Sequence, residues 1–428
     1  MKRSHRLRLL PAAALIAVGA AAPTVGSFNA AHVSAASSVN LRFANFFAPA
    51  EKVEFQNQIL PAFHKLYPNV NVSLENIPDS RVKAITQIAT GTGADVTNLG
   101  DGDVLFYADK HALKDLVPYV GQSFLNQYLP ATLAIGKVGA HEYALPKDYS
   151  PVAVYYNKAL FKAAGLAFPS TGFTWTQFRN DALALSKKSG TFSVGYDPAW
   201  SRLADAVVRS FGGKLVSSDG KHVVGYMDSP ATVKAVQFWT NLTTVDHVSP
   251  TPSQFAAATN GGADPFAQGK VAMDITGVWP SPTYNTTKGL SYGVAPFPQA
   301  SGVAPTNTIC FAGFGMASTT HYPREAAALI KLMSGPVGDA VWGKAGLPSV
   351  TSVANSQHND ATRLAFINAV KNTTTVPGDL TGPDAGAAVG MTINEGLTLI
   401  DSNPGTSVQQ VLGIEAKKGQ KELATFGQ

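Results

Sequence analysis

The sequence predicts an α/β protein with two domains. Segments with the apolar pattern of strands alternate with segments of helical pattern from residue 39 onward. The 428 residues, of which 45% are hydrophobic and 14% charged, are enough to bury more than one large core. Between Tyr143 and Gly165 one run of strand and helix patterns ends and another begins. We therefore expect the chain to pass from one domain to the other in this stretch.

The N-terminal segment has the pattern of a secretory signal peptide. Four positive charges precede an apolar, alanine-rich centre at 9–25, and small residues follow up to Ala35. The charged residues are Lys2, Arg3, Arg6 and Arg8. We expect cleavage after Ala35 or Ala36, so that residues 1–36 are a signal peptide. A buried N-terminal helix is the alternative, and a mitochondrial presequence would be amphipathic instead.

Charge and cysteine content exclude several classes of function. Removing residues 1–36 would lower the formal net charge from +5 to +1, because four positive and no negative charges leave with them. The mature chain would lack the basic patch that nucleic-acid binding requires. Cys310 is the only cysteine, so neither an internal disulfide nor a cysteine-based metal site is expected, and no cysteine lies near the cleavage site to carry a lipid. No later segment has the roughly 18 apolar residues of a membrane-spanning helix.

The first half of the chain predicts a parallel sheet. Residues 39–47 and 70–74 have strand patterns, and the segment between them, 51–67, has a helical stripe that Pro61 is expected to kink. This order is a β–α–β unit. A helix at 80–90 and a short strand at 95–99 continue the alternation.

Two segments are expected to cross between the domains. Pro146 and Pro151 argue against a helix or a central strand over Leu145–Pro151, so an extended crossover is predicted there. A buried strand at 152–156 follows, and then a helix that begins after Asn157 and stops at Gly165. An ordinary strand, turn and helix without a ligand is the alternative for this stretch. The proline- and glycine-rich segment 296–307 is the second candidate crossover.

The remaining elements are mostly helices. Asp228-Ser229-Pro230 marks a helix start, and Trp239 lies on its apolar face, where we assign it to the core. Segment 266–276 predicts a helix end and a strand, Pro323 opens a helix through Met333, and 360–426 predicts three helices.

Several polar and aromatic residues lie at expected strand ends and in loops. Asp101 and Asp103 follow the strand at 95–99, where ligands gather in open α/β sheets; a solvated helix N-cap is the alternative. Trp200 follows Asp197-Pro198 outside any apolar period, with Arg202 close behind, and could instead cover the core from a loop. Trp279 lies between Gly277-Val278 and Pro280, where the backbone is irregular.

Enzyme signatures fail on inspection. Residues 338–344 match most of a phosphate-binding loop, but Ala345 stands where a Ser or Thr should bind Mg²⁺. His141-Glu142 lacks the second histidine of a zinc helix, no G-x-S-x-G motif is present, and no carboxylate pair can be nominated from spacing. Aromatic rings and ionised carboxylates suit carbohydrate, whose C–H faces stack on rings while its hydroxyls bond to carboxylates.

Four segments in order resemble one family, the extracellular solute-binding proteins of ABC importers, specifically the sugar-binding group that includes maltose-binding proteins. These segments are ILPAFHKLYPNVNV at 59–72, ADVTNL at 94–99 with ALKDLVPYV at 112–120, LPKDYSPVAVYYNKALFKAAG at 145–165, and FAQGKVAMDITGVW at 266–279. The resemblance covers nearly all of the chain after residue 36. It departs from Gram-positive members in lacking the lipobox cysteine, so lipid anchoring is not expected.

The resemblance implies a two-lobed, type II periplasmic-binding-protein-like fold, each lobe a mostly parallel sheet flanked by helices with the ligand cleft between them. Residues 38–147 plus 309–352 would form the N-terminal lobe, and 148–308 plus 353–428 the C-terminal lobe. It also implies a set of ligand-contacting residues. These are Trp279, which would stack on sugar, Asp101, Asp103, Asn45, Phe46, Gly313 and Phe314, and, on weaker correspondence, Asp148, Tyr156 and Trp200. Arg202, which follows Trp200 closely in the sequence, is a further candidate.

The implied function is that of an exported carrier. It would capture a sugar or oligosaccharide by hinge closure and deliver it to the permease subunits of an ABC importer, as a monomer with no cofactor, no metal and no catalytic residue. Binding of a non-sugar solute such as a polyol phosphate or peptide is one alternative, although a phosphate would favour more arginine than Arg202 supplies. An exported enzyme acting on polysaccharide is the other.

Overall fold

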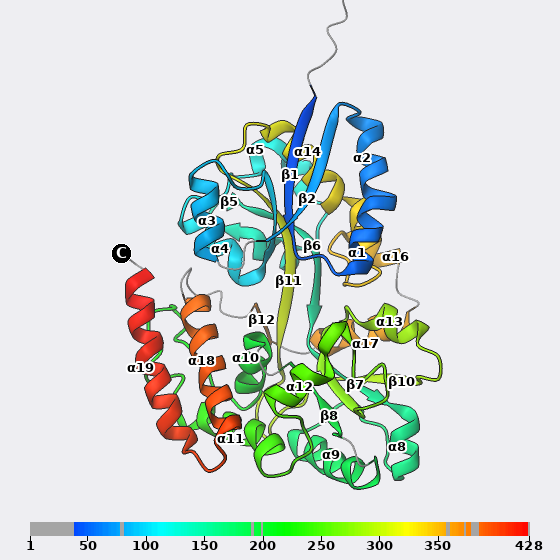
Figure 1. Ribbon diagram of the computed structural model, residues 1–428, viewed down its shortest axis with the longest axis vertical. Coiled ribbons are helices and arrows are strands. Elements are labelled where there is room, and N and C mark those ends of the chain that lie inside the picture. Colours follow the sequence, from blue (N-terminus) through cyan, green and yellow to red (C-terminus); the bar gives the residue numbers. More distant parts are fainter. Residues whose placement is uncertain are drawn as a thin grey trace, which may run out of the picture. The chain divides into compact units, whose positions relative to one another are not determined.

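The computed structural model describes residues 38–77, 81–189, 192–197, 200–356, 360–371, 374–377 and 385–426. The expected signal peptide at 1–36 lies outside these residues. Two main β-sheets organise the described chain, and helices surround them (Figure 1). The mixed α/β class and the pair of sheet-centred lobes confirm the predicted fold. No helix of the described residues is long and apolar enough to cross a membrane.

The first sheet has the strand order β12-β11-β3-β1-β2, and β6 pairs with β11 beside this path. Its strands are β1 (Val39–Asn45), β2 (Val70–Asn76), β3 (Val96–Gly100), β6 (Ala144–Pro151), β11 (Thr306–Met316) and β12 (Thr374–Pro377). β1 is parallel to both β2 and β3, which confirms the predicted β–α–β unit. β11 runs antiparallel to β3 and β6 and parallel to β12. A separate hairpin joins β4 (Lys137–Val138) and β5 (His141–Glu142).

The second sheet has the order β10-β7-β9-β8. Its strands are β7 (Ala153–Asn157), β8 (Val194–Gly195), β9 (Met273–Thr276) and β10 (Tyr292–Ala295). Only β8 and β9 are parallel, and β7 is antiparallel to both β9 and β10. The expectation of a mostly parallel sheet in each lobe is therefore corrected: both sheets are mixed, because β7 and β11 enter them against the direction of their neighbours.

Helices cover both sides of the first sheet, with α2 on one side and α3 and α4 on the other (Figure 1). The helices of this lobe are α1 (Pro49–Glu54), η1 (Phe55–Ile59), α2 (Leu60–Leu66), α3 (Arg81–Ala89), α4 (Asp101–Asp109), α5 (Val117–Val120), α6 (Gln122–Leu125), α7 (Pro130–Leu133), η2 (Ala134–Gly136), α14 (Pro323–Ser334), α15 (Pro336–Trp342) and α16 (Thr351–Ser356). The segment with the partial phosphate-binding-loop pattern lies in α15 and the turn after it, and no strand precedes it.

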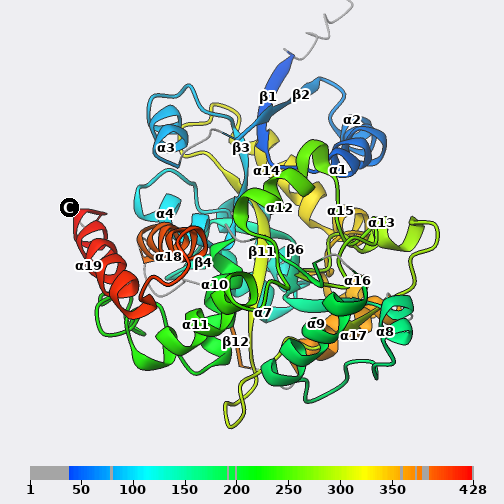
Figure 2. The same ribbon diagram turned by 60° about the horizontal axis from the view of Figure 1, so that its bottom comes forward.

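The second lobe carries the other helices. They are α8 (Lys158–Ala164), α9 (Trp175–Ser189), α10 (Ser201–Ser210), α11 (Pro230–Thr244), α12 (Pro252–Ala258), η3 (Asn260–Gly262), α13 (Ser281–Thr286), α17 (Ala361–Lys371), α18 (Ala385–Ser402) and α19 (Val408–Phe426). α18 and α19 pack side by side, as both Figure 1 and Figure 2 show. The three helices expected in 360–426 are thus present, and β12 between α17 and α18 was not expected.

Helix ends follow the predicted signals. The side chain of Asn157 accepts hydrogen bonds from the amides of Ala159 and Leu160, and Gly165 ends α8 in the left-handed conformation with φ 72°. At α11 the Ser229 side chain accepts from the Thr232 amide, and proline occupies the first turn.

The helix around Pro61 continues through the proline without a break. The five residues of η1 form a π-helix between α1 and α2, in which the Leu60 amide bonds to the Phe55 carbonyl. Proline lacks an N–H, so one helical hydrogen bond must be lost near it. The wider π turn accommodates this defect within a continuous helix, and the kink expected at Pro61 stays a prediction.

The predicted crossover at Leu145–Pro151 is extended and lies within β6. In the described residues β11 is its only strand neighbour, and an edge strand tolerates proline. The pairing is offset at Lys147, where Pro146 faces Gly313 and Asp148 faces Ala312. β6 then continues through Val152 directly into β7, so this strand connects the two sheets.

Asn307 fastens this connection to the second predicted crossover. Its side-chain amide donates to the Val152 carbonyl at 2.8 Å and its carbonyl accepts from the Val152 amide at 3.1 Å. Both residues are buried. The backbone groups of Val152, which lie between β6 and β7, are thus satisfied by one side chain at the start of β11.

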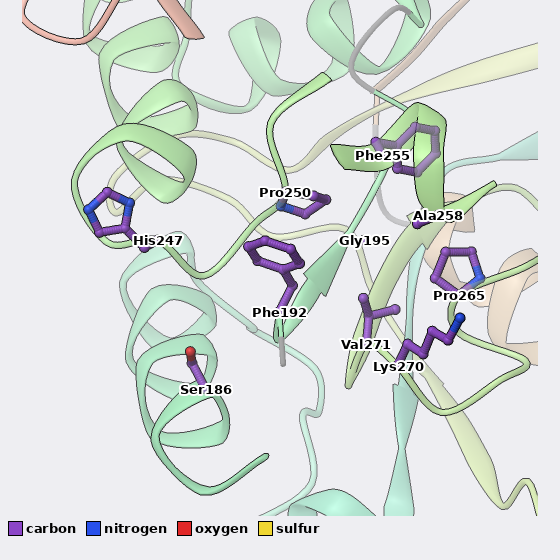
Figure 3. A pocket seen from close by; sticks show the side chains of 10 residues that line it. All are labelled: Ser186, Phe192, Gly195, His247, Pro250, Phe255, Ala258, Pro265, Lys270 and Val271. Atoms are coloured by element: carbon purple, nitrogen blue, oxygen red, sulfur yellow. The ribbon is translucent and has the colours of Figure 1, made fainter. Parts of the chain in front are cut away.

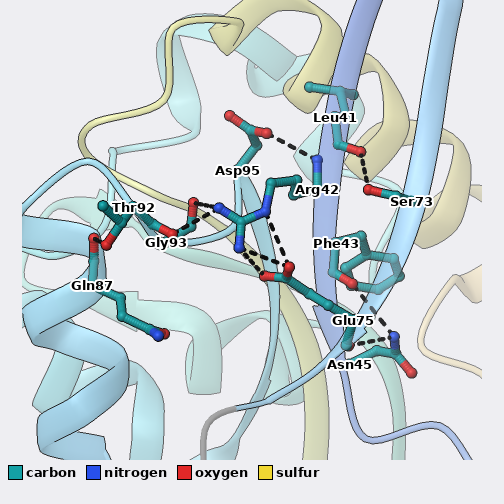
Figure 4. Close-up of polar contacts among 10 residues, drawn as sticks. All are labelled: Leu41, Arg42, Phe43, Asn45, Ser73, Glu75, Gln87, Thr92, Gly93 and Asp95. Atoms are coloured by element: carbon teal, nitrogen blue, oxygen red, sulfur yellow. Dashed lines mark hydrogen bonds and ion pairs between the residues drawn. The ribbon is translucent and has the colours of Figure 1, made fainter.

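A polar network fixes the edge of the first sheet (Figure 4). The Arg42 guanidinium contacts the Glu75 carboxylate at 2.8 Å and donates to the Thr92 carbonyl at 2.7 Å. The Arg42 amide donates to Asp95 at 2.9 Å. These contacts join β1 and β2 to the turn that precedes β3, and so hold the three strands together at the start of β3.

Each lobe has its own aromatic core. In the first, Phe43 contacts Phe55 and Phe314 at ring-centroid distances of 5.8 and 5.7 Å. In the second, Trp175 packs edge to face on Phe178 and Trp239 at 5.3 and 5.9 Å. The prediction that Trp239 belongs to the core is confirmed, because its side chain is buried.

Candidate functional site

Trp279 follows β9 through Gly277 and Val278, and 44% of its surface is exposed. Its indole lies against the glycine: a Cβ added to Gly277 would come within 2.0 Å of the ring. The Gly-x-Trp spacing therefore has a steric reason, since the ring folds back over a residue that must lack a side chain.

Trp200 lies next to Trp279. The two rings meet edge to face, with centroids 5.5 Å apart and an interplanar angle of 74°. Trp200 immediately precedes α10 and also packs against the core of the second lobe. Two loops that the sequence marked separately, one after Asp197 and one after Gly277, thus bring their tryptophans together.

Trp200 also lines a cavity of about 300 Å³ whose lining includes three carboxylates, and we call it the acid-lined cavity. Its lining residues are Gly195, Asp197, Trp200, Phe255, Thr259, Gly262, Ala263, Asp264, Pro265, Phe266, Val271, Asp274, Ile275 and Thr276. No lysine or arginine is among these residues. The site is therefore acceptor-rich, and its elements are the ends of β8 and β9, the start of α10 and the loop after α12.

The protonation of Asp274 is set by its surroundings. Burial and, after it, the negative charge of Asp264 raise the pKa of Asp274, the hydrogen bond from the Tyr284 hydroxyl at 3.1 Å opposes both effects, and the resulting pKa is about 7. Burial and the Asp274 charge in turn raise the pKa of the Tyr284 phenol, which keeps it a donor. Near neutral pH the Asp274 carboxyl can therefore either accept or donate a hydrogen bond.

The Asp264 carboxylate also accepts a hydrogen bond from the Ala267 amide at 2.9 Å. One oxygen of Asp274 lies 3.2 Å from where a Cβ of Gly195 would stand, so the glycine leaves this carboxyl room in the cavity. The arrangement combines a partly exposed indole pair with carboxyl groups, which together can bind a ring that carries hydroxyl groups.

The predicted residues of the first lobe have other surroundings. Asn45 is buried; its amide donates to the Glu75 carbonyl at 3.0 Å and its carbonyl accepts from the Phe47 amide at 3.2 Å (Figure 4). Phe46, by contrast, is 51% exposed directly after β1. Phe46 therefore remains available to a ligand, whereas the side chain of Asn45 is engaged by the backbone.

Asp101 and Asp103 both lie in the first turn of α4. One carboxylate oxygen of Asp103 accepts from the Gly100 amide at 2.9 Å, which is the helix-capping arrangement given above as the alternative. Asp101 is the first residue of α4, and its side chain lies outside the described part of the structure.

Gly313 and Phe314 lie within β11 rather than in a loop. Phe314 is fully buried in the aromatic core with Phe43 and Phe47. A Cβ on Gly313 would come within 2.5 Å of the Phe311 ring, so the glycine allows close packing. In this structure neither residue presents a side chain to a ligand.

Asp148 belongs to a buried charge cluster on β6. The Lys147 ammonium contacts both Asp148 and Glu51, the latter at 2.6 Å, and lies 5.5 Å from the centre of the Trp342 ring. A side chain on Gly346 would collide with Asp148. The Asp148 carboxylate is therefore neutralised by its neighbour in the sequence.

Tyr156 and Arg202 are also largely buried. Tyr156 packs on Phe161 and Phe168 at 5.3 and 5.5 Å, and its hydroxyl end covers Gly293. Arg202 lies in the first turn of α10 with 9% of its surface exposed. Of the eleven predicted residues, Trp279 and Trp200 contact each other, and Trp200 lines the acid-lined cavity.

The carboxylates of the cavity were not predicted as site residues. Asp274 and Thr276 occupy alternate positions of β9, in the burial pattern BiBi, so both point away from the core. The alternation of apolar and polar residues in the segment MDIT at 273–276 could have predicted this orientation from the sequence. Asp264 comes from the loop between α12 and β9, and no local pattern connects it to Asp274. Among the described residues no group of three or more potential ligands could hold a metal ion.

Taken together, fold and site define a two-lobed α/β binding protein with an aromatic, acid-lined cavity in its second lobe. Residues 48–340 match the family model of the bacterial extracellular solute-binding proteins, and this match spans more than half of the chain. The chain therefore belongs to that family.

Curated relatives match over part of their length. A binding protein of Brucella abortus (strain 2308) is 25% identical over 249 residues, which are 56% of this chain and 59% of that protein. The maltotriose-binding protein of Pyrococcus abyssi is 24% identical over 254 residues, covering 58% of this chain and 51% of that protein. The match thus spans less than two thirds of these relatives.

Solved structures share the fold over most of the chain. An ABC substrate-binding protein from Listeria monocytogenes, in complex with cycloalternan, superposes with a TM-score of 0.79 at 20% identity, covering 91% of this chain and 100% of that one. The GacH receptor of Streptomyces glaucescens gives a TM-score of 0.77 at 22% identity, covering 90% and 99%. At these identities the likeness establishes the fold.

Proposed function

We propose that this protein is the exported substrate-binding component of an ABC importer and that it binds a sugar or oligosaccharide. The observation that carries the proposal is the contact between Trp200 and Trp279 beside the acid-lined cavity. Indole faces stack on the C–H surfaces of sugars, and carboxyl groups accept hydrogen bonds from sugar hydroxyls. Proteins of known ligand with this fold include the cycloalternan complex, and a sequence relative is named for maltotriose.

The composition of the cavity favours carbohydrate over a polyol phosphate. Its described lining holds three aspartates and no lysine or arginine, so a phosphate would meet like charge. A neutral sugar satisfies both the rings and the acceptors.

Transport would follow from closure of the two lobes about β6 and β11. A ligand that contacts both lobes only in the closed form shifts the equilibrium toward that form, which the permease subunits would recognise. Phe46, exposed after β1, is the first-lobe residue we expect to contact the ligand. Micromolar affinity corresponds to about 8 kcal/mol, which a few stacked rings and charge-assisted hydrogen bonds can supply. The carrier would act as a monomer without cofactor.

A thermal-shift screen over sugars, polyols and peptides tests the ligand class. A ligand that binds only the native state at 100 times its Kd stabilises it by about 2.7 kcal/mol, which raises the melting temperature. We expect sugars alone to do so. Stabilisation by a peptide or a polyol phosphate, with none by any sugar, contradicts the proposal.

The role of the indoles is tested by calorimetry. Trp279→Ala should weaken binding of the sugar found in the screen by at least about 1 kcal/mol, because a stacked ring is lost. Phe168→Ala is the matched control, since Phe168 is an exposed aromatic of the same lobe outside the acid-lined cavity. An unchanged affinity in the Trp279 variant would remove this residue from the site.

Incubation with oligosaccharides separates a carrier from an enzyme. Asp264 and Asp274 both influence Tyr284, so the cavity does hold neighbouring carboxyl groups. We expect stoichiometric binding of maltotriose or a related oligosaccharide without change of the sugar. Appearance of shorter products in chromatography would instead support a glycoside-cleaving enzyme.

A further inference from the structure

A second cavity adjoins the acid-lined cavity in the same lobe, and we call it the apolar cavity. Its volume is about 650 Å³, within the range of about 300–1,000 Å³ that is typical of small-molecule sites. It is lined by Ser186, Phe192, Gly195, His247, Pro250, Phe255, Ala258, Pro265, Lys270 and Val271. In Figure 3 the rings of Phe192 and Pro250 lie on one side of it, and Val271 and Pro265 on the other.

The chemistry of the two cavities differs sharply. Three aspartates line the first, whereas no carboxylate is among the described residues that line the second. The polar groups of the apolar cavity are few: Ser186, His247 and Lys270, the last two exposed. One nitrogen of His247, Nδ1, already donates to the Thr243 carbonyl at 3.1 Å. A sugar placed here would lose hydrogen bonds to water without gaining enough partners.

The two cavities share part of their walls. Gly195, Phe255, Pro265 and Val271 line both. A Cβ on Gly195 would lie 3.1 Å from a methyl group of Val271 and 3.2 Å from an Asp274 oxygen. Gly195 therefore marks the place where apolar and acidic lining meet, and its lack of a side chain lets Val271 and Asp274 pack close to its backbone.

Helix α12 lines both cavities where they adjoin. It contributes Phe255 to both cavities and Ala258 to the apolar one. Its first turn is held by a reciprocal cap, in which the Thr251 hydroxyl accepts from the Gln254 amide and the Gln254 side chain accepts from the Thr251 amide. Phe255 is the residue after Gln254, so this cap fixes the position of a side chain that lines both cavities.

We propose that the ligand is a glycoside with an apolar or aromatic aglycone, whose sugar occupies the acid-lined cavity while the aglycone occupies the apolar cavity. This inference rests on the proposed carbohydrate-binding function and names the substrate class of the same site. Burial of the aglycone against Phe192, Phe255 and Pro250 adds hydrophobic stabilisation to the hydrogen bonds made by the sugar.

Matched pairs of ligands test the inference by calorimetry. The methyl and 4-nitrophenyl glycosides of glucose, mannose and maltose differ only in the aglycone. For the sugar that binds, the 4-nitrophenyl glycoside should bind at least about tenfold more tightly than the methyl glycoside, because a ring leaves water. Equal affinities within each pair overturn the inference and leave the proposed function intact. Binding of none of the six compounds, together with no stabilisation by any sugar in the thermal-shift screen, contradicts the proposed function itself.

Two variants locate the aglycone. Ala258→Trp fills the apolar cavity and should abolish the tenfold preference while leaving affinity for the methyl glycoside unchanged. Ala257→Trp is the matched control, since Ala257 is an exposed neighbour on α12 that does not line the cavity. Phe192→Ala, which removes a ring from the wall, should reduce the preference severalfold. A preference that survives both Ala258→Trp and Phe192→Ala places the aglycone elsewhere and overturns the inference.

Discussion

At the scale of single residues, Gly277 and Trp279 depend on each other. The indole occupies the space that a side chain at Gly277 would need, since an added Cβ would come within 2.0 Å of the ring. The backbone of Gly277 is not in the left-handed region, so alanine can adopt it. A methyl group at this position would therefore collide with the Trp279 ring, and it would not strain the backbone.

We predict that Gly277→Ala turns the Trp279 indole away from Trp200. Carbohydrate affinity measured by calorimetry should fall by at least about 1 kcal/mol, as in Trp279→Ala, because the stacked ring is displaced. Gly269→Ala, at a turn glycine with φ 68°, serves as the contrasting control, since it strains the backbone outside the acid-lined cavity. If Gly277→Ala binds as well as the wild type, the indole position seen here is not required.

The residue scale also shows which placements local sequence patterns can and cannot indicate. Trp200, which lies outside any apolar period, lines the cavity, and Trp279, which follows Gly277-Val278, contacts Trp200. Phe314, and on weaker correspondence Tyr156, also follow the family pattern, but both side chains are buried in the cores. Which face of a strand carries a side chain depends on register, and register is fixed by partners distant in the sequence.

At the scale of elements, the strands β6 and β11 connect the two sheets, and Asn307 joins them at Val152. Asn307→Ala would leave both backbone groups of Val152 buried and without partners. An unsatisfied buried group costs about 1–3 kcal/mol.

We therefore predict that Asn307→Ala lowers the free energy of unfolding by at least about 2 kcal/mol in urea denaturation. Asn71→Ala is the control: Asn71 also donates to two side-chain oxygens, of Asn40 and Ser38, but on the exposed edge of β2. Its loss should change stability by less than about 0.5 kcal/mol. Equal effects of the two substitutions on the free energy of unfolding would show that the buried contact with Val152 stabilises the protein no more than the exposed contacts of Asn71.

Most elements of the fold were predictable because their signals are local. The caps of α8 and α11, the β–α–β unit of β1 and β2, and the extended Leu145–Pro151 segment follow from side chains within a few residues. The antiparallel pairings of β7 and the strand β12 were not predictable in this way. They depend on which segments meet across long stretches of chain, and no residue type encodes the direction of a partner strand.

At the scale of the whole molecule, several buried carboxyl groups have raised pKa values. Burial raises the pKa of Glu142 to about 8, an increase that Lys137 opposes and Asp115 supports. Burial likewise raises the pKa to about 7 for Asp274, Asp339 and Asp401, and to about 6 for Asp181. These groups bind protons more tightly in the folded state than in the unfolded chain.

Stability should accordingly fall as the pH rises. Near pH 4 these carboxyl groups are protonated in the folded state, and their contribution is lost as the pH passes through the raised values between about 6 and 8. We predict a higher melting temperature at pH 5 than at pH 8.5. Glu142→Gln should flatten the upper part of this profile, since an amide does not titrate. A melting temperature that rises from pH 5 to 8.5 contradicts the prediction.

The boundaries expected for the two lobes remain a prediction at this scale. β6 and β11 pair with each other along almost their whole length, and the chain enters the second sheet directly after Pro151. The boundary after residue 147 therefore falls inside a continuous strand. The pairing of β6 with β11 shows how the two lobes are connected, but it does not place the boundary between the lobes at one residue.

The position of the tryptophans has an optical consequence. The chain has five, and Trp175, Trp239 and Trp342 are buried in the cores. Only Trp200 and Trp279 can meet a dissolved quencher such as iodide, and their edge-to-face contact at 5.5 Å couples their transitions. Quenching and near-ultraviolet circular dichroism would thus report on the cavity without any label. A ligand that covers the two indoles would therefore be detected as a decrease in fluorescence quenching by iodide.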